Sequence, residues 1–203
     1  MREAAPIEGK RHEIVTWAFE RFYEGGFHAM GVDEVMAGSG ISKRTLYKYF
    51  PSREALIGAV LDHYGEFIMH ELFDSVAAVG GDPRQRIVAF FDIRKAMADQ
   101  SPTRGCLGVK AALEYAVKDR AIVAQGKSAP AAVEQRLVEM CREAGFADPT
   151  ALGKEINVLF QGALLLSQVF GDSSPFVSAK AALLALLDRA AVAPRPRGKR
   201  AAN

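Results

Sequence analysis

The apolar residues of this 203-residue chain recur at spacings of three and four along most of its length, the period of an α-helix. In residues 8–24, for example, Ile14, Ala18 and Phe22 fall on one helical face. The chain has no clear alternation of polar and apolar residues, the pattern typical of β-strands. We therefore expect an all-α protein.

Glycine, proline and capping residues divide this pattern into separate helices. Gly25-Gly26 and Pro51 interrupt the periodicity, whereas Ser42 and Ser52 are residues that favour a helix start. The predicted helices cover residues 8–24, 32–38, 42–49, 52–76, 83–99, 104–118, 129–145, 150–171 and 175–191. A basic stretch from residue 194 follows, which we expect to be disordered.

Composition favours a soluble cytoplasmic protein. Hydrophobic residues make up 49% of the chain, enough for a substantial core, and the formal net charge is only +2. No uncharged apolar run reaches the roughly 20 residues that span a bilayer. Two cysteines are too few for a disulfide scaffold. His63, Glu66 and His70 share a helix face but have no evident fourth ligand, so we expect no metal site and no cofactor.

Positive charge is concentrated in residues 41–53, which hold Lys43, Arg44, Lys48 and Arg53 and no acidic residue. The segment contains the second of two short predicted helices, and the first helix precedes it. A glycine-containing turn joins the two. That arrangement is typical of a helix-turn-helix, whose second helix enters the major groove. Clustered cations would neutralise DNA phosphates. The alternative is an exposed basic face on a helical hairpin.

Residues 26–56 resemble the DNA-binding signature of the TetR/AcrR family of bacterial repressors. The matching positions are Gly26-Phe27, Val32 to Val35, Gly40-Ile41-Ser42-Lys43, Thr45-Leu46-Tyr47, Tyr49-Phe50 and Ser52-Arg53-Glu54-Ala55-Leu56. Met30-Gly31, Met36 and Arg44 depart from the usual pattern. Arg44 stands where many relatives have glycine, so it offers a contact that they lack.

The resemblance implies a set of DNA contacts and a core. Leu46 and Phe50 are implied to be core residues. The DNA-binding residues are expected to be Ser42, Lys43, Arg44, Thr45, Tyr47, Lys48, Tyr49 and Arg53, with Arg53 holding a phosphate. A DNA-binding domain of residues 1–53, with three helices, is then followed by a larger helical ligand-binding and dimerisation domain at 54–193 and a basic tail at 194–203.

The last two predicted helices are candidates for a dimer interface, because relatives pair through them and operators are approximately twofold symmetric. The candidate positions are Ile156, Phe160, Ala163, Leu164 and Ser167 in one helix and Ala179, Ala182, Leu183, Leu186 and Leu187 in the other. Periodicity fits an internal core equally well.

A ligand pocket is expected in the C-terminal domain. Its candidate lining is Phe67, His70, Phe90, Arg94, Met97, Leu113, Tyr115, Phe160 and Leu164. Such a lining favours a small apolar or aromatic effector with Arg94 or His70 as a polar anchor. Each of these residues is also compatible with an ordinary core.

Together these features predict a dimeric repressor that releases operator DNA when an effector binds. Activation of transcription fits the same residues. In a second hypothesis Cys106 senses oxidants or electrophiles, because it follows Arg104 near a helix start; the alternative is a buried cysteine. A non-specific DNA-binding protein and an enzyme with a helical pocket are the remaining classes, although we find no catalytic motif.

Overall fold

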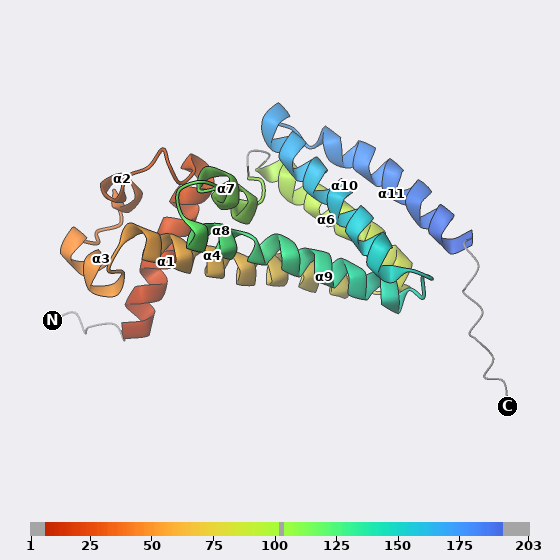
Figure 1. Ribbon diagram of the computed structural model, residues 1–203, viewed down its shortest axis with the longest axis horizontal. Helices are drawn as coiled ribbons and strands as arrows, with labels where there is room; N and C mark the ends of the chain where they lie inside the picture. Colours follow the sequence, from red (N-terminus) through yellow and green to blue (C-terminus); the bar gives the residue numbers. More distant parts are fainter. Residues whose placement is uncertain (1–6, 102–103, 193–203) are drawn as a thin grey trace. The chain divides into compact units, whose positions relative to one another are not determined.

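The computed structural model describes residues 7–101 and 104–192, and within them every regular element is helical (Figure 1). The elements are α1 (Ile7–Gly25), α2 (Val32–Met36), α3 (Lys43–Tyr49), α4 (Arg53–Ile68), the π-helix η1 (Met69–Asp74), α5 (Ser75–Ala78), α6 (Pro83–Gln100), α7 (Leu107–Glu114), α8 (Arg120–Gly126), α9 (Ser128–Glu143), α10 (Pro149–Phe170) and α11 (Ser174–Val192). The predicted fold class is confirmed. The predicted tail at 194–203 lies outside the described residues.

Two predicted helices differ from the structure. The helix expected at 52–76 contains the π-helical turn η1. The helix expected at 104–118 is regular only in α7, and a short helix that we did not predict, α8, follows it. Asp119 begins α8, because its carboxylate accepts the backbone N–H groups of Ala121 and Ile122.

The chain forms two compact units. One contains the described residues of 1–71 and 103–132, and the other those of 72–102 and 133–203. The units do not follow the predicted boundary after residue 53. The difference arises because α4 contacts α1, α7 and α8, so the middle of the chain joins the N-terminal helices.

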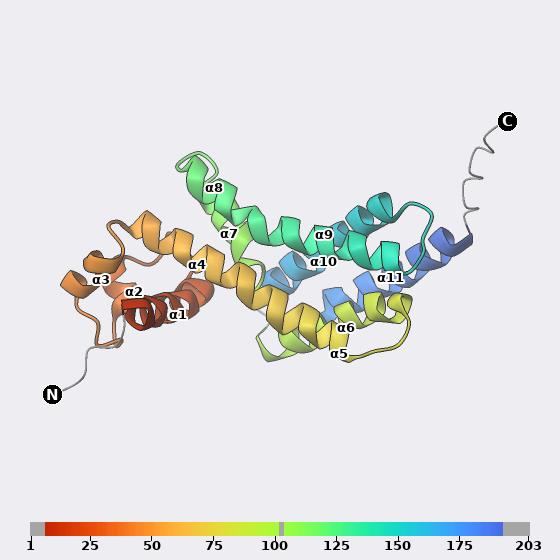
Figure 2. The same cartoon turned by 90° about the horizontal axis from the view of Figure 1, so that it is seen from below.

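Helices α1 and α4 pack against each other in the first unit (Figure 2). Ile14, Phe22 and Ile57 are fully buried there. Helices α7 and α8 approach each other so closely that a Cβ at Gly108 would lie 2.4 Å from the carbonyl oxygen of Gly126. This contact requires glycine, because any larger residue would force the two helices apart.

The second unit contains an aromatic core. Helices α10 and α11 form a hairpin at Gly171, whose φ of 75° favours glycine. The Phe90 and Phe160 ring centroids lie 4.5 Å apart, and both side chains are buried. Phe73, Phe91 and Phe176 extend the ring cluster.

None of the described helices is both long and apolar enough to cross a membrane.

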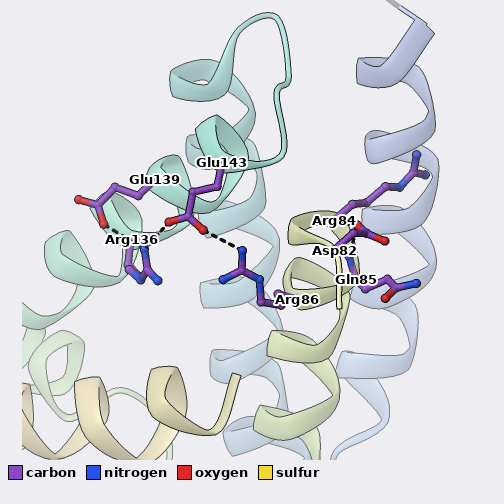
Figure 3. A network of polar contacts seen from close by, with 7 residues as sticks. All are labelled: Asp82, Arg84, Gln85, Arg86, Arg136, Glu139 and Glu143. Carbon is purple, nitrogen blue, oxygen red and sulfur yellow. Dashed lines mark hydrogen bonds and ion pairs between the residues drawn. The ribbon is translucent and has the colours of Figure 1, made fainter. Parts of the chain in front are cut away.

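A charged network joins α6 to α9 within the second unit (Figure 3). Arg86 of α6 donates to Glu143 of α9 at 3.0 Å. Glu143 also accepts from Arg136 at 3.1 Å, and Arg136 reaches Glu139 at 3.3 Å. These side chains are partly exposed, so the network adds geometric definition more than stability.

Candidate DNA-binding site

The turn between α2 and α3 has the geometry of a helix-turn-helix. Gly40 adopts a φ of 70°, in the left-handed region that favours glycine. Ser39 stabilises the turn, since its hydroxyl donates to the Met36 carbonyl at 2.7 Å and accepts from the Ile41 N–H at 3.0 Å. The chain therefore reverses within a few residues, as the sequence predicts.

The inner side of α3 is fixed by a cap and by burial. The Ser42 hydroxyl accepts the Thr45 N–H at 3.1 Å, which confirms the predicted N-cap. Leu46 and Phe50 are 1% and 2% exposed, which confirms that they are core. The Arg11 guanidinium lies 5.1 Å from the Phe50 ring centroid. The opposite side of the helix therefore faces solvent.

Seven of the eight predicted DNA-binding residues lie at this solvent-facing side or its edge. The exposed ones are Ser42, Lys43, Arg44, Tyr47 and Lys48, and the partly exposed ones are Thr45 and Tyr49. Tyr47 is 43% exposed, so its ring is accessible from solvent. The surface combines hydroxyl groups, rings and cations.

Charge on this surface is only partly compensated. Lys43 forms an exposed ion pair with Asp33 at 2.8 Å, and the hydrogen bond and charge of Asp33 raise the pKa of Lys43. Lys48 lies 5.7 Å from the Tyr49 ring centroid. Among the described residues, neither Arg44 nor Lys48 forms an ion pair. Both can therefore reach a phosphate without first breaking a salt bridge.

Arg53, the eighth predicted DNA-binding residue, has partners inside the protein. Its Nη1 donates to the Tyr115 hydroxyl at 2.6 Å. Its Nη2 donates to the carbonyl oxygens of Phe27 and, at 3.2 Å, Met30. These contacts link the start of α4 to the loop before α2, a role that the resemblance did not imply.

Trp17 also supports the motif, and sequence reasoning did not single it out. Its indole N–H donates to the Val35 carbonyl at 2.8 Å and thereby fastens α2 to α1. The chain has one tryptophan. The single tryptophan in the helix before the motif was the available signal, but the carbonyl that it contacts is not visible in the sequence.

The nine predicted ligand-binding residues are divided between the units. The first unit holds Phe67, His70, Leu113 and Tyr115, and the second holds Phe90, Arg94, Met97, Phe160 and Leu164. Leu113 is 67% exposed. Phe90 and Phe160 pack against each other as core residues do. Tyr115 is buried beside Phe27 and His28 of the first unit.

His70 lines a groove of about 730 Å³ within the first unit. The other lining residues are Leu61, Asp62, Gly65, Glu66, Met69, Ser128, Ala129 and Ala132. The groove thus lies between α4 with its π-helical extension and the start of α9. Its lining combines apolar side chains with two carboxylates. Nowhere in the described part of the chain do three His, Cys, Asp or Glu side chains gather in a way that could hold a metal ion.

The two cysteines are both buried and form no disulfide. Cys106 is the N-cap residue of α7, which agrees with its predicted place near a helix start. Arg104, the cation expected to activate it, forms ion pairs with Glu20 and with Glu24. Its guanidinium also lies 5.1 Å from the Tyr23 ring centroid. Arg104 is therefore held by α1.

The structure thus has the features of a helix-turn-helix DNA-binding protein: an all-helical scaffold and a short basic helix with one side exposed to solvent. Comparison with known protein families supports this class. Residues 14–60 match the family model for bacterial regulatory proteins of the tetR family, and residues 83–182 match the C-terminal domain model of LmrA/YxaF-like transcriptional regulators. The chain therefore belongs to the TetR family and is a ligand-responsive, DNA-binding transcriptional regulator.

Relatives and solved structures cover nearly the whole chain. The chain is 27% identical to the uncharacterized HTH-type transcriptional regulator YxaF of Bacillus subtilis (strain 168), over 82% of this chain and 89% of YxaF. Identity to LmrA of the same organism is 24%, over 88% and 97%. The TetR-family regulator SCO4454 of Streptomyces coelicolor has a TM-score of 0.81 at 20% identity, covering 90% of this chain and 96% of that one.

Burial predicts that Cys141 is chemically inert in the folded protein. Desolvation raises the pKa of its thiol to about 12, so almost no reactive thiolate exists near neutral pH. We expect iodoacetamide at about pH 8 to leave Cys141 unmodified in the native protein and to modify it in denaturant. Peptide mass spectrometry measures both. Equal native and denatured rates would contradict the burial of this thiol.

Proposed function

We propose that this regulator is a dimeric repressor that leaves its operator when a small molecule occupies a groove in its first unit. The observation that carries the proposal is the exposed side of α3, where cations and a tyrosine ring face solvent above a buried apolar side. Because its partner would be chromosomal DNA, we propose a cytoplasmic location. Family membership favours this role over the alternative of an enzyme with a helical pocket.

The proposed DNA contacts are the residues of the exposed side. They are Ser42, Lys43, Arg44, Thr45, Tyr47, Lys48 and Tyr49. Lys43, Arg44 and Lys48 would supply phosphate contacts, and Tyr47 would reach a base edge or a thymine methyl. For Arg53 we propose a supporting role, because its guanidinium is engaged by the protein.

For the dimer interface we propose a surface on α10 and α11 that differs from the predicted positions. Most of those positions, including Ile156, Phe160 and Leu183, are buried inside the second unit. This burial agrees with the alternative interpretation, in which they form an internal core. Seven of the eleven exposed large hydrophobic residues among the described ones belong to these two helices: Val158, Leu165, Leu166, Val169, Phe170, Val177 and Leu184. The gathering of so many exposed large apolar side chains on two paired helices favours an interface with a second copy.

A hollow in this surface supports the same interface. It has a volume of about 660 Å³ and is lined by Glu155, Val158, Leu159, Ala182, Ala185, Leu186 and Arg189. Ala182 and Leu186 are the predicted interface positions that reach it. Small residues in the hollow would admit bulky side chains of a second copy, so the four helices could form a bundle.

We propose that the effector binds the groove lined by His70. Leu61, Met69 and Ala129 supply apolar surface for an apolar or aromatic molecule, and His70 supplies the polar anchor. The groove belongs to the same unit as the DNA-binding helices. An occupant could therefore act on them through α4, provided that it binds the released conformation more tightly.

Two alternatives remain inside the regulator class. Sensing by Cys106 is the weaker one, because the Glu20 and Glu24 carboxylates compensate the neighbouring Arg104. Activation is the other: one relative, 33% identical over 43% of this chain and 41% of its own length, is named the transcriptional activator FasR of Mycolicibacterium smegmatis. Transcription of a reporter gene with and without the regulator distinguishes repression from activation.

The DNA-contact proposal is tested by Lys43→Ala combined with Tyr47→Ala. Because both side chains are exposed, we expect the fold to persist and the affinity for the regulator's own upstream region to fall at least about tenfold. Fluorescence anisotropy across a salt series should also show a shallower salt dependence, by about one phosphate contact per subunit. Lys127→Ala removes an exposed cation elsewhere and should change neither value. Unchanged binding by the double variant would remove the proposal.

The interface proposal is tested by Val158→Glu combined with Val169→Glu. These side chains are 72% and 66% exposed in the single chain, so the substitutions should not disturb its core. Buried carboxylates would, however, face each other across the dimer. We expect light scattering to give a monomer mass and operator binding to weaken. Val117→Glu, at a residue 95% exposed in the first unit, is the control and should remain dimeric. A persistent dimer in the double variant would refute this interface.

The effector proposal is tested by filling the groove at Gly65. Gly65 lines the groove, and a Cβ at this position meets no atom within 4 Å, so a side chain can be added here at the groove wall. We expect Gly65→Leu to retain operator binding but to lose binding of N-phenylnaphthylamine, a neutral aromatic fluorescent probe. Gly65→Ala leaves the groove open and stabilises the helix by about 0.5–1 kcal/mol. Equal probe binding in all three proteins would exclude this groove.

A further inference from the structure

The loop at residues 26–31 joins α1 to α2 and so directs the helix-turn-helix. Two of its successive N–H groups donate to a single carboxylate, that of Glu114 at the end of α7. The distances are 3.2 Å from Phe27 N to Oε1 and 2.6 Å from His28 N to Oε2. Hydrogen bonds to a charged acceptor are among the stronger ones in proteins. Glu114 therefore holds a loop that lies 86 and 87 residues away in the sequence.

The same loop is held a second time through the His28 side chain. Its Nε2 lies 2.6 Å from the backbone oxygen of Glu114, and the ring nitrogen must donate because a carbonyl oxygen only accepts. The His28 ring also packs on the Tyr115 ring, with 4.7 Å between centroids. Main chain and side chain of the loop are thus both fixed to residues 114 and 115.

Tyr115 extends this contact to the other end of the motif. Its hydroxyl accepts from Arg53 at 2.6 Å, and Arg53 is the first residue of α4, three positions after Phe50 ends the recognition helix. Arg53 in turn donates to the Phe27 and Met30 carbonyls. Tyr115 is 5% exposed, so this hydrogen bond lies in a region that excludes most water.

We infer that Glu114 and Tyr115 are positioning residues for operator binding, which set the orientation of the recognition helix by holding the chain on both sides of it. The inference rests on the proposed operator binding. Neither residue lies on the exposed side of α3. They act through the 26–31 loop and through Arg53, so movement of α7 must either carry the motif along or break these bonds.

The clearest test compares Glu114→Gln and Tyr115→Phe with wild type. The glutamine keeps one acceptor oxygen but turns an NH₂ group toward the second N–H donor, and the phenylalanine removes only the hydroxyl. We expect each variant to lose about tenfold in affinity for the operator and less than about twofold for random DNA. Non-specific binding depends on the cations of α3, which both variants retain. Tyr115→Phe involves no change of charge.

Hydrogen exchange measures the contact itself. In Glu114→Gln, amides of residues 26–31 should exchange faster than in wild type, while those of α10 should not change. Val117→Ala is the matched control, since this residue lies just past the end of α7, is 95% exposed and should leave exchange and operator preference unaltered.

Three results would overturn the inference. Unchanged exchange in Glu114→Gln would show that the carboxylate does not hold the loop. Faster exchange with unchanged operator affinity would show that the loop does not orient the recognition helix. Equal losses for operator and random DNA, with a lowered melting temperature, would indicate a merely structural role. If wild type itself does not prefer its operator, the proposed function fails instead.

Discussion

The recognition helix α3 is only seven residues long, and its function depends on anchoring by the rest of the structure. Isolated helices of this length are not stable in water, because few hydrogen bonds offset the cost of ordering the chain. Leu46 and Phe50 anchor α3 by burial, and Ser42 satisfies an N–H at its start. Only with that inner side fixed can the cations on the outer side be presented in one orientation.

Much of the anchoring comes from a distant part of the sequence. Helices α7 and α8 return to the first unit and pack on α4, with Gly108 and Gly126 in backbone contact. The DNA-binding helices therefore share a core with the middle of the chain. This arrangement gives a regulator a direct physical route from α7 to the loop before α2, without requiring the signal to pass along α4 alone.

Sequence periodicity predicted the buried side of the amphipathic N-terminal helices accurately. It was less accurate in predicting which side of the apolar C-terminal helices is exposed. In α3, the apolar positions are few and the polar ones charged, so the buried side is unambiguous. In α10 and α11, apolar residues cover most of the circumference, and periodicity cannot tell which of them a second copy would cover. The predicted interface therefore selected Ile156 and Leu183, which are buried inside the unit, and omitted Val158 and Val169, which are exposed.

By itself, the sequence determined the all-α class, the two short helices of the motif, the caps at Ser42 and Ser52, and the family to which the chain belongs. The class, the helices and their caps depend on residues within about four positions of one another, a range over which helical geometry is fixed, and the family signature lies within the one segment 26–56. Only the tertiary structure decided that Arg53 turns inward, that His70 lines a groove, and that Glu114 holds the loop at Phe27 and His28. Partners that lie between 23 and 87 residues apart leave no local pattern, because their proximity arises from packing of the whole unit.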